Sequence, residues 1–213
     1  GLIGLNDAGK SSFIDLMLGQ AEATGGEIVL EGADYRPKSI EQANRRGVYH
    51  ISRHSKLIDA LSPEDNLTVI KGDIAGWRLT RRAESLQKLR ELLEETGLTE
   101  MCARDVAQLT NVEKYLLEIL KAMLNGAKLL LLSDILDIFD HEEDYLRLCA
   151  LLERLHERGI AVVNISNRFH KILQYADRTF IFSQGRLVKT LYREEINRGT
   201  LERCLIAPEN LSR

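Results

Sequence analysis

The segment Gly-Leu-Asn-Asp-Ala-Gly-Lys-Ser at residues 4–11 is the feature that most constrains what this chain can fold into. It satisfies the pattern Gly-x-x-x-x-Gly-Lys-Ser/Thr, which is typical of a loop that wraps phosphate groups between a buried strand and a helix. Glycines let backbone N–H groups point inward at an anion, and a helix that begins at Lys10 directs the positive end of its dipole to the same point. We therefore predict nucleotide-binding residues at Gly4, Asn6, Asp7, Ala8, Gly9, Lys10, Ser11 and Ser12.

The side chains of this loop have separate predicted roles. Lys10 is predicted to reach the β- and γ-phosphates, and the hydroxyl of Ser11 is predicted to bind magnesium. Asp7 departs from this chemistry, because a carboxylate repels a triphosphate. Aspartate tolerates a left-handed backbone, however, so the loop can keep its shape with this side chain turned outward. The alternative interpretation of the motif is a glycine-rich turn followed by an ordinary surface lysine.

Composition excludes several other classes of protein. The chain has 213 residues, enough for one large domain, and its net charge of -3 gives no bulk attraction for nucleic acid. No apolar run approaches the roughly 18 residues of a membrane span, so we predict no direct insertion into a membrane. Three cysteines (Cys102, Cys149 and Cys204) are odd in number and far apart, which favours thiols over a disulfide or a metal site and weakly indicates a reducing, cytoplasmic setting.

The hydrophobic pattern predicts strands alternating with helices. Strands are predicted at 25–32, 47–52, 128–134 and 160–166, with a hairpin at 178–191; helices are predicted at 10–18, 79–96, 112–124, 142–158, 168–176 and 200–206. This alternation indicates an α/β sheet with helices on both faces. The stretch of about 68–125 has no evident strand, so we predict a helical lobe inserted into a single domain that spans residues 1–213. Because only three residues precede the phosphate-binding loop, we expect the numbered chain to be a fragment of a longer polypeptide.

Several segments match one family in the same order along the chain. GLNDAGKSSFIDLMLG (4–19) resembles GENGAGKSTLMKILxG, LTNVEKYLLEILKAM (109–123) resembles LSxGQQQMVEIAKAL, and AKLLLLSDILDIFD (127–140) resembles AKxLIMDEPTxALT. These motifs are the Walker A loop, the signature helix, and the Walker B strand with its D-loop. The chain therefore resembles the nucleotide-binding domain of ABC transporters, and in particular the N-terminal cassette of ribose-, galactose- and xylose-type sugar importers.

The resemblance implies a fold, ligands and partners. It implies a P-loop NTPase sheet of the ABC type, flanked by helices, whose usual N-terminal strands are missing from this numbering. It implies binding of ATP and magnesium, and pairing with a second ABC domain as a homodimer, a heterodimer or a tandem half. It also implies a membrane permease as a partner, which would place the protein in the cytoplasm or at the inner face of the cell membrane. Leu57, Ile58 and Leu61 follow the Q-loop, where the family grips the permease; core packing is the alternative role for them.

Several positions that carry the family's chemistry hold other residues here. Ser133 stands where an aspartate holds magnesium, and Asp134 stands where a glutamate polarises the attacking water. Arg53 occupies the position of the Q-loop glutamine, and Asn167 that of the switch histidine. A solvated arginine and a helix N-cap are the structural alternatives for these two residues.

The signature motif is also altered, at Leu109, Thr110, Asn111, Val112 and Glu113. Thr110 replaces a serine and Val112 replaces the glycine, whose lack of a side chain allows close approach to phosphate. Asp137 of the D-loop is retained. Phosphoryl transfer needs charge neutralisation and an oriented water, and both are weakened here. We therefore predict nucleotide binding with weak or absent hydrolysis.

Two other functions stay open on the sequence. One is a non-transport regulatory or scaffold module built on a retired ABC domain. The other is an active ATPase in which Asp134 supplies the catalytic carboxylate or carries the metal, with Arg53 as a cation near the γ-phosphate. A P-loop kinase or GTPase fits the order of the motifs less well.

Overall fold

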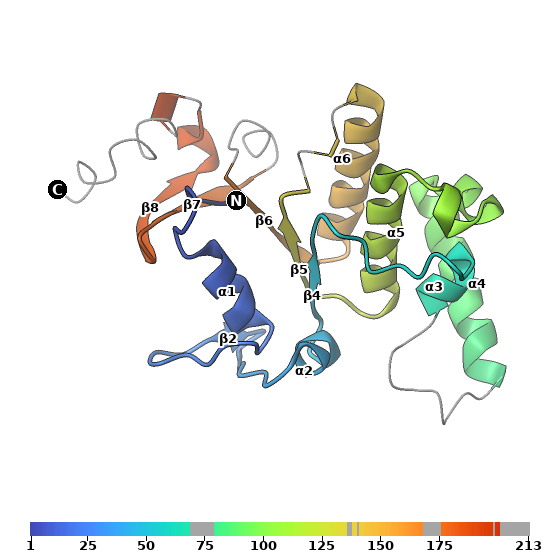
Figure 1. Cartoon of the computed structure of the whole chain (residues 1–213), viewed down its shortest axis with the longest axis horizontal. Helices are drawn as coiled ribbons and strands as arrows, with labels where there is room; N and C mark the ends of the chain where they lie inside the picture. Colours follow the sequence, from blue (N-terminus) through green and yellow to red (C-terminus); the bar gives the residue numbers. More distant parts are fainter. Residues whose placement is uncertain (69–78, 136–137, 140, 168–175, 198, 201–213) are drawn as a thin grey trace. The chain divides into compact units, whose positions relative to one another are not determined.

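A computed structural model describes residues 1–68, 79–135, 138–139, 141–167, 176–197 and 199–200 (Figure 1). The chain divides into two compact units, Gly1–His50 with Leu129–Leu136 and Val162–Arg213, and Ile51–Lys128 with Asp137–Ala161. The first unit combines the N-terminal elements, which are blue in Figure 1, with the hairpin of β7 and β8, which is orange. The second unit covers a wider range than the helical lobe predicted at about 68–125.

A six-stranded sheet, in the order β4-β5-β6-β1-β7-β8, organises the first unit. Its strands are β1 (Leu2–Ile3), β4 (Val48–Ile51), β5 (Leu129–Ser133), β6 (Ala161–Ser166), β7 (Arg178–Ser183) and β8 (Arg186–Tyr192). The central strand β1 is parallel to both neighbours, with Leu2 opposite Ile165 on one side and Phe180 on the other. The predicted α/β architecture is therefore confirmed.

The predicted hairpin is also confirmed. Strands β7 and β8 are antiparallel, and Ser183 pairs with Arg186 across a two-residue turn. Gln184 and Gly185 in that turn have positive φ values of 49° and 74°, as a type I′ turn requires. A second, two-stranded sheet joins β2 (Val29–Leu30) to β3 (Ala33–Asp34), and only β2 lies within the single strand predicted at 25–32.

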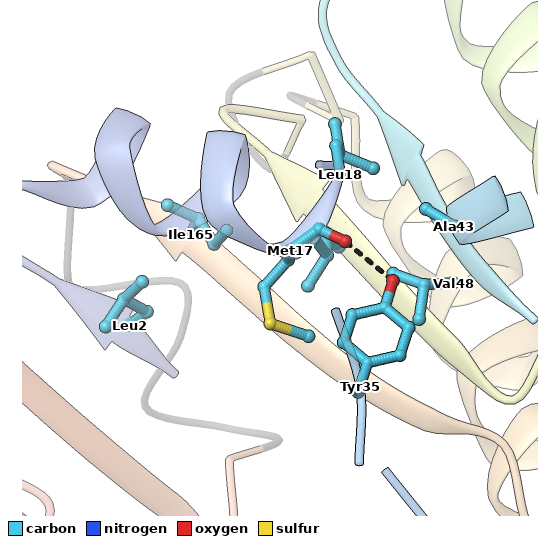
Figure 2. Packing of buried hydrophobic residues seen from close by; sticks show 8 residues of the cluster. Leu2, Met17, Leu18, Tyr35, Ala43, Val48 and Ile165 are labelled. Carbon is cyan, nitrogen blue, oxygen red and sulfur yellow. Dashed lines mark hydrogen bonds between the residues drawn. The ribbon is translucent and has the colours of Figure 1, made fainter. Parts of the chain in front are cut away.

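The core of the first unit lies between the sheet and two short helices, α1 (Lys10–Met17) and α2 (Ile40–Arg45). Buried residues from both sides meet there: Leu2, Met17, Leu18, Tyr35, Ala43, Val48, Leu131 and Ile165 (Figure 2). Tyr35 is fully buried, and its hydroxyl donates a hydrogen bond to the carbonyl oxygen of Met17 at 2.6 Å. Burial raises the pKa of Tyr35 to about 12, so the hydroxyl remains a donor at the end of α1.

Helices form most of the second unit. Its α-helices are α3 (Pro63–Thr68), α4 (Leu79–Thr96), α5 (Asn111–Leu124) and α6 (Glu142–Glu157), and short 3₁₀ helices span Thr99–Ala103 and Val106–Gln108. Helix α5 is the most buried of these, because apolar residues occur on most of its circumference. The helices predicted at 168–176 and 200–206 fall almost wholly outside the described residues.

Polar contacts tie α5 to the segment that follows β4. The carboxylate of Glu118 is buried and accepts hydrogen bonds from the Ser55 hydroxyl and the Lys56 N–H. Desolvation raises the pKa of this carboxyl group, and the two hydrogen bonds oppose that rise. The Tyr115 hydroxyl donates to the carbonyl oxygen of Ser52. Side chains of α5 therefore hold residues 52–56 through hydrogen bonds.

Removing the buried tyrosine hydroxyl tests the packing at the end of α1. Tyr35→Phe is expected to lower the free energy of unfolding by about 1 kcal/mol, because the carbonyl oxygen of Met17 then loses its buried donor. Urea unfolding followed by circular dichroism measures this difference.

Tyr192 provides the matched control, since its side chain is 54% exposed. Tyr192→Phe is expected to change the free energy of unfolding by less than about 0.5 kcal/mol. Equal effects of the two substitutions would contradict the role given to Tyr35.

Candidate functional site

The predicted phosphate-binding loop runs from the end of β1 to the start of α1. Asp7 has a left-handed backbone with φ 62° and an exposed side chain, and Gly9 has φ 100° directly before the helix. A Cβ atom on Gly4 would lie 2.6 Å from Ala8 Cβ and 2.7 Å from the Phe182 carbonyl oxygen. Glycine is therefore required at position 4 by steric contact, and position 9 favours it through its backbone conformation.

The hairpin β7–β8 supports this loop from the same unit. The N–H of Gly185 donates to the carbonyl oxygen of Ala8 at 3.0 Å, and Ala8 itself is buried. A hollow of about 270 Å³ lies between the loop and the hairpin, lined by Leu5, Asn6, Asp7, Ala8, Phe182, Ser183 and Gln184. The turn at Gln184-Gly185 was predicted correctly from the sequence, but the contact between this turn and the loop was not predicted.

Lys10 points back into the loop. Its ammonium group donates to the carbonyl oxygens of Gly4 at 2.5 Å and Leu5 at 2.8 Å. Desolvation lowers the pKa of Lys10, while the negative charges of Asp134 and Asp7 act in the opposite direction. A bound phosphate would replace the two carbonyl acceptors with charged oxygens, which form stronger hydrogen bonds with an ammonium group.

Ser133, the last residue of β5, contacts a histidine of the neighbouring strand β4. Ser133 is 9% exposed, and its Oγ atom lies 2.8 Å from Nε2 of His50 on β4. Asp134 follows with φ 54°, and its N–H donates to the carbonyl oxygen of Ile165 at 2.9 Å. The contact between His50 and Ser133 was not predicted, because these residues are 83 positions apart in the sequence.

The residues near the loop fit magnesium poorly. Nucleotide sites usually hold magnesium through one or two carboxylates together with the phosphates, and in P-loop proteins a Walker B aspartate is one of them. Ser11 offers one exposed hydroxyl, whereas the hydroxyl of Ser133 is already paired with an imidazole. Among the residues that the structure describes, no group of three or more His, Cys, Asp or Glu side chains could hold a metal ion.

The other predicted positions are divided between the two units. Asn167 is exposed immediately after β6 in the first unit. Arg53 is exposed, and it belongs with residues 109–113 to the second unit. Asp137 lies outside the described residues.

The predicted signature residues have a clear structural role at the start of α5. Thr110 is the N-cap: its hydroxyl accepts from the Glu113 N–H at 3.2 Å, and the Glu113 carboxylate accepts from the Thr110 N–H at 2.8 Å. Desolvation of Glu113 raises its pKa, but hydrogen bonds from Arg104 and Thr110 hold it below the usual value. Leu109 and Val112 are buried, while Asn111 is exposed. This arrangement is a capping box, which stabilises a helix N-terminus.

The sheet, the loop and the helix after it define a P-loop nucleotide-binding domain. A family model described as "ABC transporter" matches residues 1–135. The chain belongs to the ABC transporter family, as the sequence motifs predicted.

Curated relatives cover almost the whole chain. Ribose import ATP-binding protein RbsA of Shigella dysenteriae serotype 1 (strain Sd197) is 27% identical over 205 residues, which are 96% of this chain and 41% of that protein. Ribose import ATP-binding protein RbsA 3 of Rubrobacter xylanophilus is 31% identical over 206 residues, 97% of this chain and 41% of that protein. This chain therefore spans about two fifths of the length of the relatives it matches.

Solved structures share the fold. The ADP conformation of MJ1267, an ATP-binding cassette of an ABC transporter, has a TM-score of 0.77 at 20% identity and covers 98% of this chain and 84% of its own. The structure of cbiO1 from Clostridium perfringens has a TM-score of 0.77 at 16% identity, with coverage of 99% and 84%. In the described part of the chain, no helix has the length and apolar character that crossing a membrane requires.

The capping role of Thr110 is testable by stability. Thr110→Ala is expected to lower the free energy of unfolding by about 1 kcal/mol, because the Glu113 N–H loses its acceptor at the helix start. Thr110→Ser keeps the hydroxyl and is expected to stay within about 0.5 kcal/mol of the original protein. Chemical denaturation compares the three proteins, and an alanine variant as stable as the serine variant would refute the cap.

Proposed function

We propose that this protein is an ATP-binding cassette domain of a carbohydrate-import type that holds ATP and hydrolyses it weakly or not at all. The observation that carries this proposal is the contrast between two parts of one unit, the loop after β1 and the end of β5. The loop at residues 4–11 keeps the conformation and the lysine that phosphate binding needs. The end of β5 has a serine hydrogen-bonded to His50 where the family has a magnesium-holding carboxylate.

Weak hydrolysis follows from what the remaining residues can do. Attack on the γ-phosphate needs neutralised charge and a positioned water, with a metal ion supplying part of both. Ser133 brings no charge to the end of β5, and magnesium on Ser11 would have only one hydroxyl ligand there. Asn167 has no ring nitrogen with which to respond to the γ-phosphate. Because such residues act as a unit, losing several leaves little activity.

The partners proposed are a second ABC domain and a membrane permease, at the inner face of the cell membrane. The named relatives are import ATP-binding proteins, which supports a role beside a permease. Ile58 offers a surface for such contact: it is 46% exposed, and the buried side chain of Asn66 fixes its backbone through hydrogen bonds to the N–H and the carbonyl oxygen. In a head-to-tail pair, the changes at Thr110–Glu113 affect the partner's site, and those at Ser133 and Asn167 affect this one.

Calorimetry with ATP and magnesium, run beside a phosphate-release assay, tests the proposal. Lys10→Ala is expected to weaken ATP binding by at least about tenfold, since it removes the charge donated to the phosphates. Phosphate release is expected to stay at the blank with or without this substitution.

Lys38→Ala is the matched control, because it removes the same charge from an exposed position in the same unit. It is expected to leave ATP binding unchanged. Release of phosphate far above the blank that depends on Lys10 would contradict the proposal, and absence of ATP binding would favour the alternative of a scaffold module.

One observation favours the second candidate, a working ATPase. Desolvation lowers the pKa of Lys10, and this shift is opposed by the negative charge of Asp134, which directly follows β5 in the same unit. If Asp134 supplies the catalytic carboxylate, turnover is present in the original protein and falls by about 100-fold or more in Asp134→Asn. Under the preferred function, Asp134→Asn is expected to change nothing in the release assay, because there is no turnover to lose.

A further inference from the structure

The contact between His50 and Ser133 determines what the end of β5 can offer to a nucleotide. The Ser133 hydroxyl is nearly buried, and its oxygen lies 2.8 Å from Nε2 of the imidazole. A neutral imidazole donates to this oxygen or accepts from it, and an imidazolium donates to it. In each of these states the pair is neutral or positive, so it gives a divalent cation no negative charge to approach.

Asp134 is the next carboxylate along the chain, and its setting is different. Its N–H is held by the carbonyl oxygen of Ile165, with the residue in a left-handed conformation. Desolvation lowers the pKa of Lys10 and the negative charge of Asp134 opposes that shift, so carboxylate and ammonium attract each other within this unit. This attraction favours the ammonium group of Lys10 as the cation that Asp134 faces, in place of a magnesium ion brought by the nucleotide.

The loop itself supplies positive potential that does not depend on a metal. Helix α1 begins at Lys10, and the left-handed residues Asp7 and Gly9 shape the turn before it. Backbone N–H groups at a helix start and a lysine side chain together stabilise phosphate charge.

From this disagreement between the site and magnesium, and resting on the nucleotide-binding function proposed above, we infer that this protein binds nucleoside triphosphate equally well with and without Mg²⁺. The phosphates are held by the loop and Lys10, and the His50–Ser133 pair leaves the metal without its usual carboxylate. The ligand class is therefore the metal-free nucleotide as much as the magnesium complex.

Calorimetric titration with ATP, in excess MgCl₂ and separately in excess EDTA, tests this inference on the unaltered protein. The two dissociation constants are expected to agree within about threefold. A loss of affinity greater than that on removing magnesium overturns the inference while leaving the nucleotide-binding function intact. Absence of ATP binding in both buffers overturns the proposed function itself, and the inference with it.

Substitutions at the pair sharpen the result. The double variant His50→Leu with Ser133→Asp places a carboxylate at the end of β5 without an imidazole beside it, and is expected to bind ATP about tenfold or more tightly in magnesium than in EDTA. His50→Leu alone is the matched control and is expected to bind equally in both buffers, because it adds no charge. Circular dichroism checks that each variant is folded. A magnesium preference in the original protein that Asp134→Asn abolishes would overturn the inference and assign the metal to Asp134.

Discussion

Two buried residues position the predicted phosphate-binding loop. Leu2 and Ile3 are both almost fully buried. They form β1, which lies between β6 and β7 and runs parallel to both. A strand this short has few hydrogen bonds of its own, so it depends on having a partner on both sides. Because the loop leaves the sheet directly after Ile3, the direction of β1 determines where Gly4 and Lys10 lie.

The loop is stabilised by close contacts as well as by the strand. Ala8 and Phe182 leave no room for a side chain at Gly4, and Gly185 of the β7–β8 turn donates a hydrogen bond to the Ala8 carbonyl oxygen. These contacts shape the backbone whether or not any catalytic residue is present. We therefore propose that phosphate binding persists on this scaffold although Ser133 provides no carboxylate at the end of β5.

The sequence predicted elements with strong local signals and missed contacts between distant residues. Helix α1, strand β5 and the turn at Gln184-Gly185 follow from a glycine stop, an apolar run and turn chemistry. The helix α2, by contrast, was not predicted, because its six residues give too short a pattern. The capping box at Thr110 was not predicted, because residues 109–113 were interpreted as a family signature motif. The contact between His50 and Ser133 was not predicted either, because it depends on β4 and β5 being neighbours in the sheet.

The central claim is that this domain holds ATP and hydrolyses it weakly or not at all. It is tested most directly by identifying the nucleotide that remains on the protein after prolonged incubation with ATP and magnesium. Rapid removal of unbound nucleotide, acid release and ion-exchange chromatography would show which nucleotide was bound. The account predicts ATP, with ADP close to the amount found in a sample without protein. Conversion of the bound ATP to ADP, absent in Lys10→Ala, would contradict it.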